Sequence, residues 1–220
     1  MHFDKLFEGV YRVDGKLATK NLTPRKKVYG EDLVKHSGIE YRMWNPYRSK
    51  LAAALINGLE NMEIKAGAKI LYLGSATGTT PSHVSDIIGH DGRLFGVEIS
   101  ERNMREFVKL CELRDNMLPI LADASHPESY EKSVGTCDII YQDVAVKEQA
   151  QIMLKNSGML KKGGYAYFII KSQSVDVSKN PAEVFKAELA KLEGTFEVLE
   201  KVHIEPYDSL HMFAVLRKIE

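Results

Sequence analysis

The clearest motif in this chain lies at residues 69–81, which read Lys69-Ile70-Leu71-Tyr72-Leu73-Gly74-Ser75-Ala76-Thr77-Gly78-Thr79-Thr80-Pro81. Five residues of strand character run into a turn of small residues, and a helical pattern follows, with Pro81 suited to the first turn of a helix. Gly74, Ala76 and Gly78 stand at alternate positions, where the absence of bulk lets a ligand approach the backbone. Such a strand–turn–helix places a ligand at the carboxyl end of the first strand of an open α/β sheet.

The next strand-like run, 93–98, ends in Glu98, a carboxylate that can accept hydrogen bonds from ribose hydroxyls. The dinucleotide fingerprint Gly-x-Gly-x-x-Gly is not matched, because Ala76 and Thr79 occupy its second and third glycine positions. A nicotinamide dehydrogenase is therefore the weakest enzyme reading. The turn instead suits a nucleoside cofactor without a phosphate, and S-adenosylmethionine is the obvious candidate. The alternative is an ordinary βα bend that needs small residues only for its shape.

Length and composition predict one sizeable domain with a small appendage, since the chain has 220 residues and 44% hydrophobic residues. No run of eighteen apolar residues occurs, and the first residues lack the apolar core of a signal peptide, so no membrane span is expected. Cys111 and Cys137 form no Cys-x-x-Cys pair, which argues against a disulfide framework or structural zinc. We expect a cytoplasmic, metal-free protein.

Charge is balanced overall but uneven along the chain. Thirty basic residues match thirty acidic ones, whereas residues 1–50 hold eleven Lys/Arg against six Asp/Glu. This positive amino-terminal part suggests contact with RNA or a partner, for which Arg25, Lys26 and Lys27 are the candidates. A solvated basic face would give the same pattern.

Strand and helix patterns alternate along most of the chain. Asp14-Gly15 separates strand-like residues 10–13 and 16–19 and predicts a hairpin with a tight primed turn. Asn45-Pro46 predicts a helix start, with Asn45 as the cap. Further elements are expected as strands at 117–121, 137–142, 165–170, 196–204 and 210–216, and as a helix at 147–160. The final two strands have no helix between them, so one of them should run antiparallel.

These patterns predict an α/β protein with a seven-stranded Rossmann-like, S-adenosylmethionine-dependent methyltransferase fold. A small β-rich region at residues 1–45 should precede a methyltransferase domain at 46–220. Polar residues fall at the ends of successive strands, namely Glu98, Asp123, Asp143 and Lys171, and such ends share one crevice in an open sheet. Glu98 would hold the ribose, Asp123 would accept from the adenine amine, and Asp143 would lie beside the methyl sulfonium.

Longer segments resemble fibrillarin, especially its archaeal form. The resemblance is carried by Glu40-Tyr41-Arg42-Met43-Trp44-Asn45-Pro46-Tyr47-Arg48-Ser49-Lys50-Leu51-Ala52-Ala53-Ala54, by Leu71-Tyr72-Leu73-Gly74 with Gly78-Thr79-Thr80 and Ser82-His83-Val84-Ser85-Asp86, and by Asp143-Val144-Ala145, Ile170-Lys171 and Glu205-Pro206-Tyr207 before His211. The similarity covers nearly the whole chain. The glycine–arginine-rich amino-terminal tail of eukaryotic fibrillarin is missing.

This resemblance implies an RNA-guided ribose 2′-O-methyltransferase that acts on ribosomal, and also transfer, RNA as the catalytic subunit of a box C/D ribonucleoprotein. Its implied partners are a guide RNA paired with the target rRNA, a Nop-domain scaffold protein and an L7Ae-type kink-turn-binding protein. The implied catalytic tetrad is Lys50, Asp143, Lys171 and His211. The cofactor contacts, including the two turn positions, are expected at Gly74, Ala76, Thr79, Thr80, Glu98, Ile99, Asp123, Ala124, Asp143, Val144, Ala145 and Val146.

A ribose hydroxyl is a poor nucleophile at neutral pH, so methyl transfer gains from a base and from in-line placement. We expect Lys171 to be the base and Asp143 to orient it, while Lys50 and His211 position the hydroxyl or stabilise developing negative charge. Two positions depart from the family pattern. Val146 stands where glutamine is usual, and Asp208-Ser209-Leu210-His211 replaces an Asp-Arg-Asp-His-like run.

Two alternatives remain open at this level. One is a small-molecule O-methyltransferase of the same fold, although many of those place a metal at the acceptor site, where this chain offers two lysines. The other is a non-catalytic RNA-binding subunit that keeps the fold as an interaction module.

Overall fold

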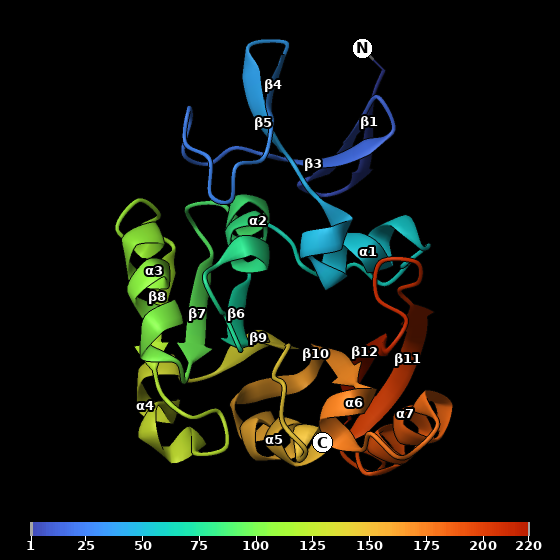
Figure 1. Cartoon of the computed structure of the whole chain (residues 1–220). Coiled ribbons are helices and arrows are strands. Elements are labelled where there is room, and N and C mark those ends of the chain that lie inside the picture. Colours follow the sequence, from blue (N-terminus) through green and yellow to red (C-terminus); the bar gives the residue numbers. More distant parts are fainter. Residues whose placement is uncertain (1, 220) are drawn as a thin grey trace.

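The computed structural model describes residues 2–219 and contains two sheets (Figure 1). The smaller, amino-terminal sheet is antiparallel and has the strand order β1-β2-β3-β5-β4. Its strands are β1 (Phe3–Phe7), β2 (Val10–Val13), β3 (Lys16–Lys20), β4 (Leu33–His36) and β5 (Ile39–Met43). The predicted hairpin is confirmed: Val13 pairs with Lys16, and Asp14 and Gly15 have φ of 45° and 80°, as a type I′ turn requires.

The larger sheet has seven strands in the order β11-β12-β10-β9-β6-β7-β8. Its strands are β6 (Lys69–Leu73), β7 (Arg93–Glu98), β8 (Met117–Leu121), β9 (Cys137–Gln142), β10 (Leu160–Lys171), β11 (Phe196–His203) and β12 (His211–Lys218). The strands from β6 to β10 pair in parallel, whereas β12 is antiparallel to both of its neighbours, β10 and β11. The predicted fold class, with one reversed strand in the final pair, is therefore confirmed.

Helices cover both faces of the larger sheet. They are α1 (Lys50–Ile56), α2 (Thr79–Ile88), α3 (Glu101–Cys111), α4 (Glu131–Val134), α5 (Gln149–Asn156), α6 (Ser172–Val175) and α7 (Pro181–Ala190), with 3₁₀ turns at Pro46–Arg48, Pro127–Ser129 and Ser157–Met159. No helix within residues 2–219 has the length and apolar character needed to cross a membrane.

Three predicted boundaries were wrong. Asn45 caps only the 3₁₀ turn Pro46–Arg48, because Ser49 is extended (φ −149°) and itself caps α1 by accepting from the Ala52 N–H. The helix expected at 147–160 is shorter, since its last residues form a 3₁₀ turn and then enter β10. β10 starts at Leu160 rather than Tyr165, because a register irregularity carries Lys161-Lys162-Gly163-Gly164 within the strand instead of a loop.

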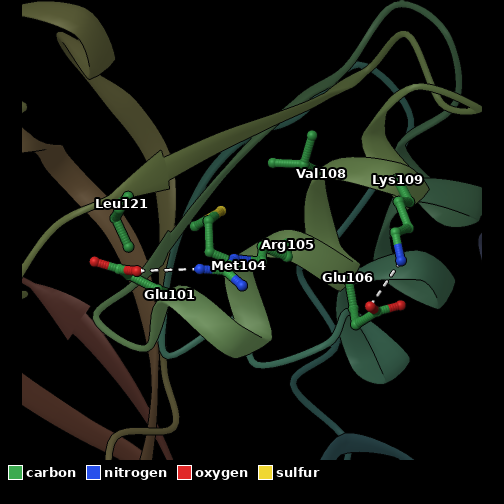
Figure 2. Close-up of a pocket in the computed structure, with 7 residues that line it drawn as sticks. All are labelled: Glu101, Met104, Arg105, Glu106, Val108, Lys109 and Leu121. Atoms are coloured by element: carbon green, nitrogen blue, oxygen red, sulfur yellow. Dashed lines mark hydrogen bonds and ion pairs between the residues drawn. The ribbon is translucent and has the colours of Figure 1, made fainter.

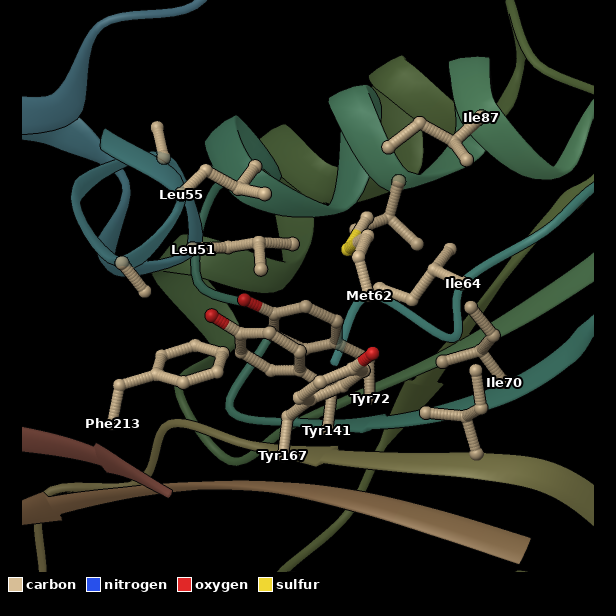
Figure 3. Close-up of a cluster of buried hydrophobic side chains, with 14 of the residues drawn as sticks. Leu51, Leu55, Met62, Ile64, Ile70, Tyr72, Ile87, Tyr141, Tyr167 and Phe213 are labelled. Carbon is tan, nitrogen blue, oxygen red and sulfur yellow. The ribbon is translucent and has the colours of Figure 1, made fainter. Parts of the chain in front are cut away.

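A row of tyrosines crosses the sheet on the face that α1 covers (Figure 3). Tyr72 on β6, Tyr141 on β9 and Tyr167 on β10 are paired in register. The rings of Tyr72 and Tyr141 are stacked, with centroids 4.4 Å apart, and Phe213 closes the row 5.6 Å from Tyr167. These rings are fully buried and support Leu51 of α1, which fixes the helix that begins at Lys50.

A buried ion network joins the amino-terminal sheet to α2, which lies directly below that sheet in Figure 1. The carboxylate of Asp86 accepts from Arg42 Nη1 at 2.8 Å and from Arg114 Nη1 at 2.7 Å, and all three side chains are buried. Arg42 also pairs with Glu31 at 2.6 Å. Burial alone would raise the pKa of Glu31, but the Arg42 charge and the N–H groups of Tyr29 and Val28 outweigh it and lower that pKa. We propose residue 45/46 as the boundary between the two units, which this network holds together.

His83 belongs to the same joint. Its ring lies 2.8 Å from both Thr19 Oγ1 and Tyr29 Oη, and it stacks on Trp44. Because Thr19 gives its only hydroxyl proton to Asp86, His83 Nδ1 must be the donor to Thr19. Burial, with the nearby Arg42 and Arg114 charges, holds the pKa of His83 well below its usual value. The residue is thus a neutral structural histidine.

Removing the Asp86 carboxylate should destabilise the whole fold. In Asp86→Ala two buried guanidinium groups lose a partner, and breaking a buried pair in this way costs about 3–5 kcal/mol. Urea unfolding followed by circular dichroism measures the loss. Asp115→Ala is the matched control, because Asp115 pairs with His90 on the exposed surface and its loss should barely change the midpoint. Equal effects of the two substitutions would contradict the network's structural role.

Candidate active site

The side chains of Lys50, Asp143 and Lys171 meet at the carboxyl ends of the central strands. Lys50 Nζ lies 3.2 Å from the Asp143 carboxylate, and Lys171 Nζ lies 2.8 Å from Asp143 Oδ1. Lys171 also donates to the main-chain oxygen of Asp143 at 2.8 Å. The three side chains are only 24%, 15% and 12% exposed, so the carboxylate and both lysines form a partly buried triad. Three segments far apart in sequence therefore converge on one carboxylate.

Gly74 makes room for the main chain of Asp143. Asp143 directly follows β9, and its N–H donates to Leu73 O at 2.9 Å, which continues the pairing with β6. A Cβ on Gly74 would stand 2.9 Å from the Asp143 carbonyl oxygen, and the φ of +84° at Gly74 is itself left-handed. Glycine is thus required here by both the turn and the neighbouring backbone.

His211 is the first residue of β12 and pairs across the strands with Lys171. Its Nδ1 lies 2.5 Å from Asp208 Oδ2. Burial lowers the pKa of His211, and the Lys50 and Lys171 charges lower it further, while Asp208 and Asp143 act in the opposite direction. The ring is therefore mainly neutral at pH 7. Its cross-strand pairing with Lys171 places it at the edge of the triad.

The turn after β6 is open and is tied to Glu98. Gly74 and Ser75 both donate to Val97 O, and Ala76 adopts a left-handed φ of +48° with its residue exposed. The Ala76 N–H donates to Glu98 Oε2 at 2.9 Å, and the Ser100 N–H donates to Oε1 at 2.8 Å. A carboxylate offers about four acceptor sites, so two remain for hydroxyl donors. Glu98 both shapes the turn and keeps the capacity to bind a diol.

The other predicted cofactor positions lie around this turn and the neighbouring strand ends. Thr79 and Thr80 begin α2, and the Thr80 hydroxyl is buried and donates to Ser49 Oγ at 3.0 Å, so it braces α1 instead of facing outward. Ile99 is exposed on the surface next to Glu98. Asp123 accepts from the Ser125 N–H at 2.8 Å, and this bond is the main cause of its lowered pKa. Ala124, which follows it, is buried.

The run after Asp143 is held by a residue that the sequence did not single out. Val144 is half-buried, whereas Ala145 and Val146 are exposed. Gln149 is fully buried; its amide donates to the carbonyls of Val146 at 2.9 Å and Lys171 at 3.2 Å, and its oxygen accepts from the Lys171 N–H. One glutamine thus ties the loop after β9 to the end of β10. Gln149 is the first residue of α5 and follows Lys147 and Glu148, so no local signal in the sequence distinguishes it from a surface residue.

A shallow hollow lies elsewhere, along the outer side of α3 (Figure 2). Met104 and Val108 of α3 and Leu121 of β8 line it together with charged side chains of the helix. None of the residues predicted for the cofactor or the tetrad lines it, so the Asp143 cluster remains the site with a chemical rationale.

The sequence model of the fibrillarin family ("Fibrillarin") matches residues 1–219. The chain belongs to the fibrillarin family. A member from Thermococcus sibiricus, described as a fibrillarin-like rRNA/tRNA 2′-O-methyltransferase, is 53% identical over 218 residues, which cover 96% of each chain. The family resemblance seen in the sequence is confirmed.

Solved structures of the family superimpose on this fold. An Aeropyrum pernix fibrillarin in complex with natively bound S-adenosyl-L-methionine is 45% identical, with a TM-score of 0.91 over 98% of both chains. The fibrillarin of a fibrillarin/Nop5p complex is 35% identical, also with a TM-score of 0.91, over 98% of this chain and 100% of that one. The Rossmann-like methyltransferase fold and the amino-terminal sheet are features of the family.

Gly74→Ala should destabilise the fold more than the same substitution at a glycine that has a similar left-handed φ but free space around it. Gly15 is the matched control, because its φ of +80° is close to that of Gly74 while nothing lies within 4 Å of an added Cβ. Each alanine carries a left-handed penalty of about 1–2 kcal/mol, and only Gly74→Ala adds a collision with the Asp143 carbonyl. Urea unfolding of both variants tests this. Equal losses would mean that the approach of Asp143 to Gly74 is not tight.

Proposed function

We propose that this chain is an S-adenosylmethionine-dependent methyltransferase that methylates the ribose 2′-hydroxyl of ribosomal and transfer RNA. The observation that carries the proposal is the convergence of Lys50 and Lys171 on Asp143, beside a turn suited to a nucleoside without phosphates. The described activity of the Thermococcus sibiricus relative and the cofactor bound to the Aeropyrum pernix fibrillarin support the same reaction.

The residues around the β6 turn fit the cofactor. Glu98 keeps acceptor capacity for the ribose diol, and Asp123 offers a carboxylate for the adenine amine. Gly74 and Ala76 leave the turn open for the amino-acid tail, and the run Asp143 to Val146 borders it; Thr79, Ile99 and Ala124 complete the proposed contacts. We include Thr80 among these contacts because it lies in the first turn of α2. Its hydroxyl already donates to Ser49, so its role is to position α2 beside the cofactor. The cofactor supplies an electrophilic methyl group on a sulfonium.

The triad accounts for the acceptor chemistry. In its neutral form Lys171 takes the proton of the 2′-hydroxyl, and its contacts with the carboxylate and the carbonyl of Asp143 fix its position. Lys50, on the other side of the carboxylate, stabilises negative charge as it develops on the attacking oxygen. The mainly neutral His211 ring holds the hydroxyl from the β12 side.

We further propose that the chain works as the catalytic subunit of a box C/D ribonucleoprotein. The fibrillarin/Nop5p complex supports a Nop-domain scaffold as its protein partner. A guide RNA that pairs with the target would select the nucleotide, and an L7Ae-type protein would bind the kink-turn of that guide. Because the chain has no net charge, electrostatic attraction alone gives it little affinity for RNA. Recognition of the target by the guide RNA and the partner proteins is consistent with this charge.

Lys171→Ala should remove methyl transfer and spare cofactor binding. Loss of a positioned base lowers the rate on the order of 10²–10⁴-fold, while the β6 turn is untouched. Tritium transfer from labelled cofactor to RNA in the reconstituted assembly measures the rate, and calorimetry measures cofactor affinity. Lys162→Ala, at the other end of β10, is the control and should match the unmodified chain. A Lys171→Ala assembly that transfers methyl groups at the normal rate would refute the assignment, and an assembly with no transfer by the unmodified chain would refute the enzyme.

The pKa of His211 should lie below its ordinary value of about 6.5. Because Asp208 raises this pKa, Asp208→Asn should lower it further; because Lys50 lowers it, Lys50→Met should raise it. Titration of the imidazole signals by NMR gives all three values, and Asp115→Asn, on the exposed surface, is the control. A His211 pKa that rises in Asp208→Asn, or falls in Lys50→Met, would show that these two charges do not act on the ring in the expected way.

A further inference from the structure

An exposed aromatic ring lies three residues before Lys50 of the triad. Tyr47 is 71% exposed, and it is the one aromatic residue among the exposed large hydrophobic side chains of residues 2–219. Every other phenylalanine, tyrosine or tryptophan in that range is buried or half-buried. The exposure of this ring is therefore a particular feature of the segment that leads into Lys50.

The Tyr47 ring is held in place by the turn that carries it and by a neighbouring aromatic ring. Pro46 and the Asn45 side chain, which accepts from the Tyr47 N–H at 2.9 Å, fix the 3₁₀ turn that carries it. The Tyr207 ring meets it edge-on, with centroids 4.9 Å apart and planes at 75°. A pre-positioned ring loses little conformational entropy when it binds, which suits a stacking surface.

The pair also bridges two walls of the site. Tyr47 lies three residues before Lys50, and Tyr207 lies four residues before His211. The loop that carries Tyr207 is fastened to α1, because Asn57 Nδ2 donates to the carbonyls of His203 and Glu205, as the red loop beside α1 in Figure 1 illustrates. Both rings therefore belong to segments that lead directly into proposed site residues.

Positive charge accompanies the ring. Arg48 follows Tyr47 directly, is exposed, and places its guanidinium 5.4 Å from the centre of the Tyr29 ring, a cation–π distance that limits its movement. Arg48 thus adds a positive charge to the same 3₁₀ turn that carries Tyr47, and aromatic rings together with cationic side chains are the groups that bind single-stranded nucleic acid.

We propose that Tyr47, backed by Tyr207, contacts the RNA nucleotide next to the ribose being methylated, with Arg48 beside its phosphate. The inference rests on the proposed function and adds the surface that holds the RNA strand against the triad. It makes Tyr47 a substrate-binding residue, whereas a merely structural pair would only brace the β11–β12 loop against α1.

Steady-state kinetics in the reconstituted assembly separates these roles. Tyr47→Ala should raise the KM for target RNA about 5- to 150-fold, the range seen when a stacking aromatic is removed, with kcat largely kept. Tyr47→Phe retains the ring and should retain most of the affinity. Ile56→Ala, which trims an exposed apolar side chain at the other end of α1, is the matched control and should leave KM unchanged. A fall in kcat with unchanged KM in Tyr47→Ala would overturn the proposal in favour of the bracing role.

A binding measurement tests the contact independently of methyl transfer. The Tyr47→Trp variant puts an indole on the surface, whereas the native tryptophan, Trp44, is buried. Addition of target RNA to the assembly should quench the fluorescence of the new indole, and RNA of unrelated sequence should not. Absence of quenching by target RNA in an assembly that still methylates it would reject the contact while the enzyme assignment stands. Absence of methylation by the unmodified assembly would reject the proposed function itself.

Discussion

Two lysines that lie far apart in the sequence both contact the carboxylate of Asp143, and this contact depends on how the surrounding elements are packed. Lys50 comes from the start of α1 and Lys171 from the end of β10, and both reach Asp143 within 3.2 Å. Because Asp143 lies between the two amino groups, its negative charge screens Lys50 and Lys171 from each other. The geometry demands that α1, β9 and β10 keep their relative positions to within a fraction of an ångström.

Each of these elements is fixed by a different device. The tyrosine row on the sheet supports α1 from below, and the Thr80–Ser49 hydrogen bond ties its first turn to α2. Gly74 permits the close approach of the Asp143 backbone to β6, and Gln149 connects the following loop to the end of β10. The Arg42–Asp86 network then fastens the amino-terminal sheet to α2. Stability and site geometry therefore depend on the same contacts.

The parallel sheet and the reversal of one strand in the final pair could be predicted from the sequence, because strand and helix patterns alternate until that pair. The polar residues at the strand ends were also found, since parallel strands bring their carboxyl ends to one edge. Their assembly into a tetrad came from the family resemblance, and the structure brings these residues together without testing their chemistry. Contacts between distant segments were invisible: nothing local in Arg42, Asp86 or Gln149 indicates which groups surround them. The break at Ser49 was missed because Asn45-Pro46 is a good cap for either a 3₁₀ turn or an α-helix.

We propose that this cluster activates a ribose hydroxyl, so a target RNA that lacks only that oxygen atom is the decisive substrate. Two target RNAs would be compared in the complete assembly with tritiated S-adenosylmethionine, identical except for ribose or 2′-deoxyribose at the selected nucleotide. We expect label in the first RNA and none in the second, with equal binding of both. Equal labelling of the two RNAs would place the methyl group on another atom and refute the role of the cluster in ribose methylation.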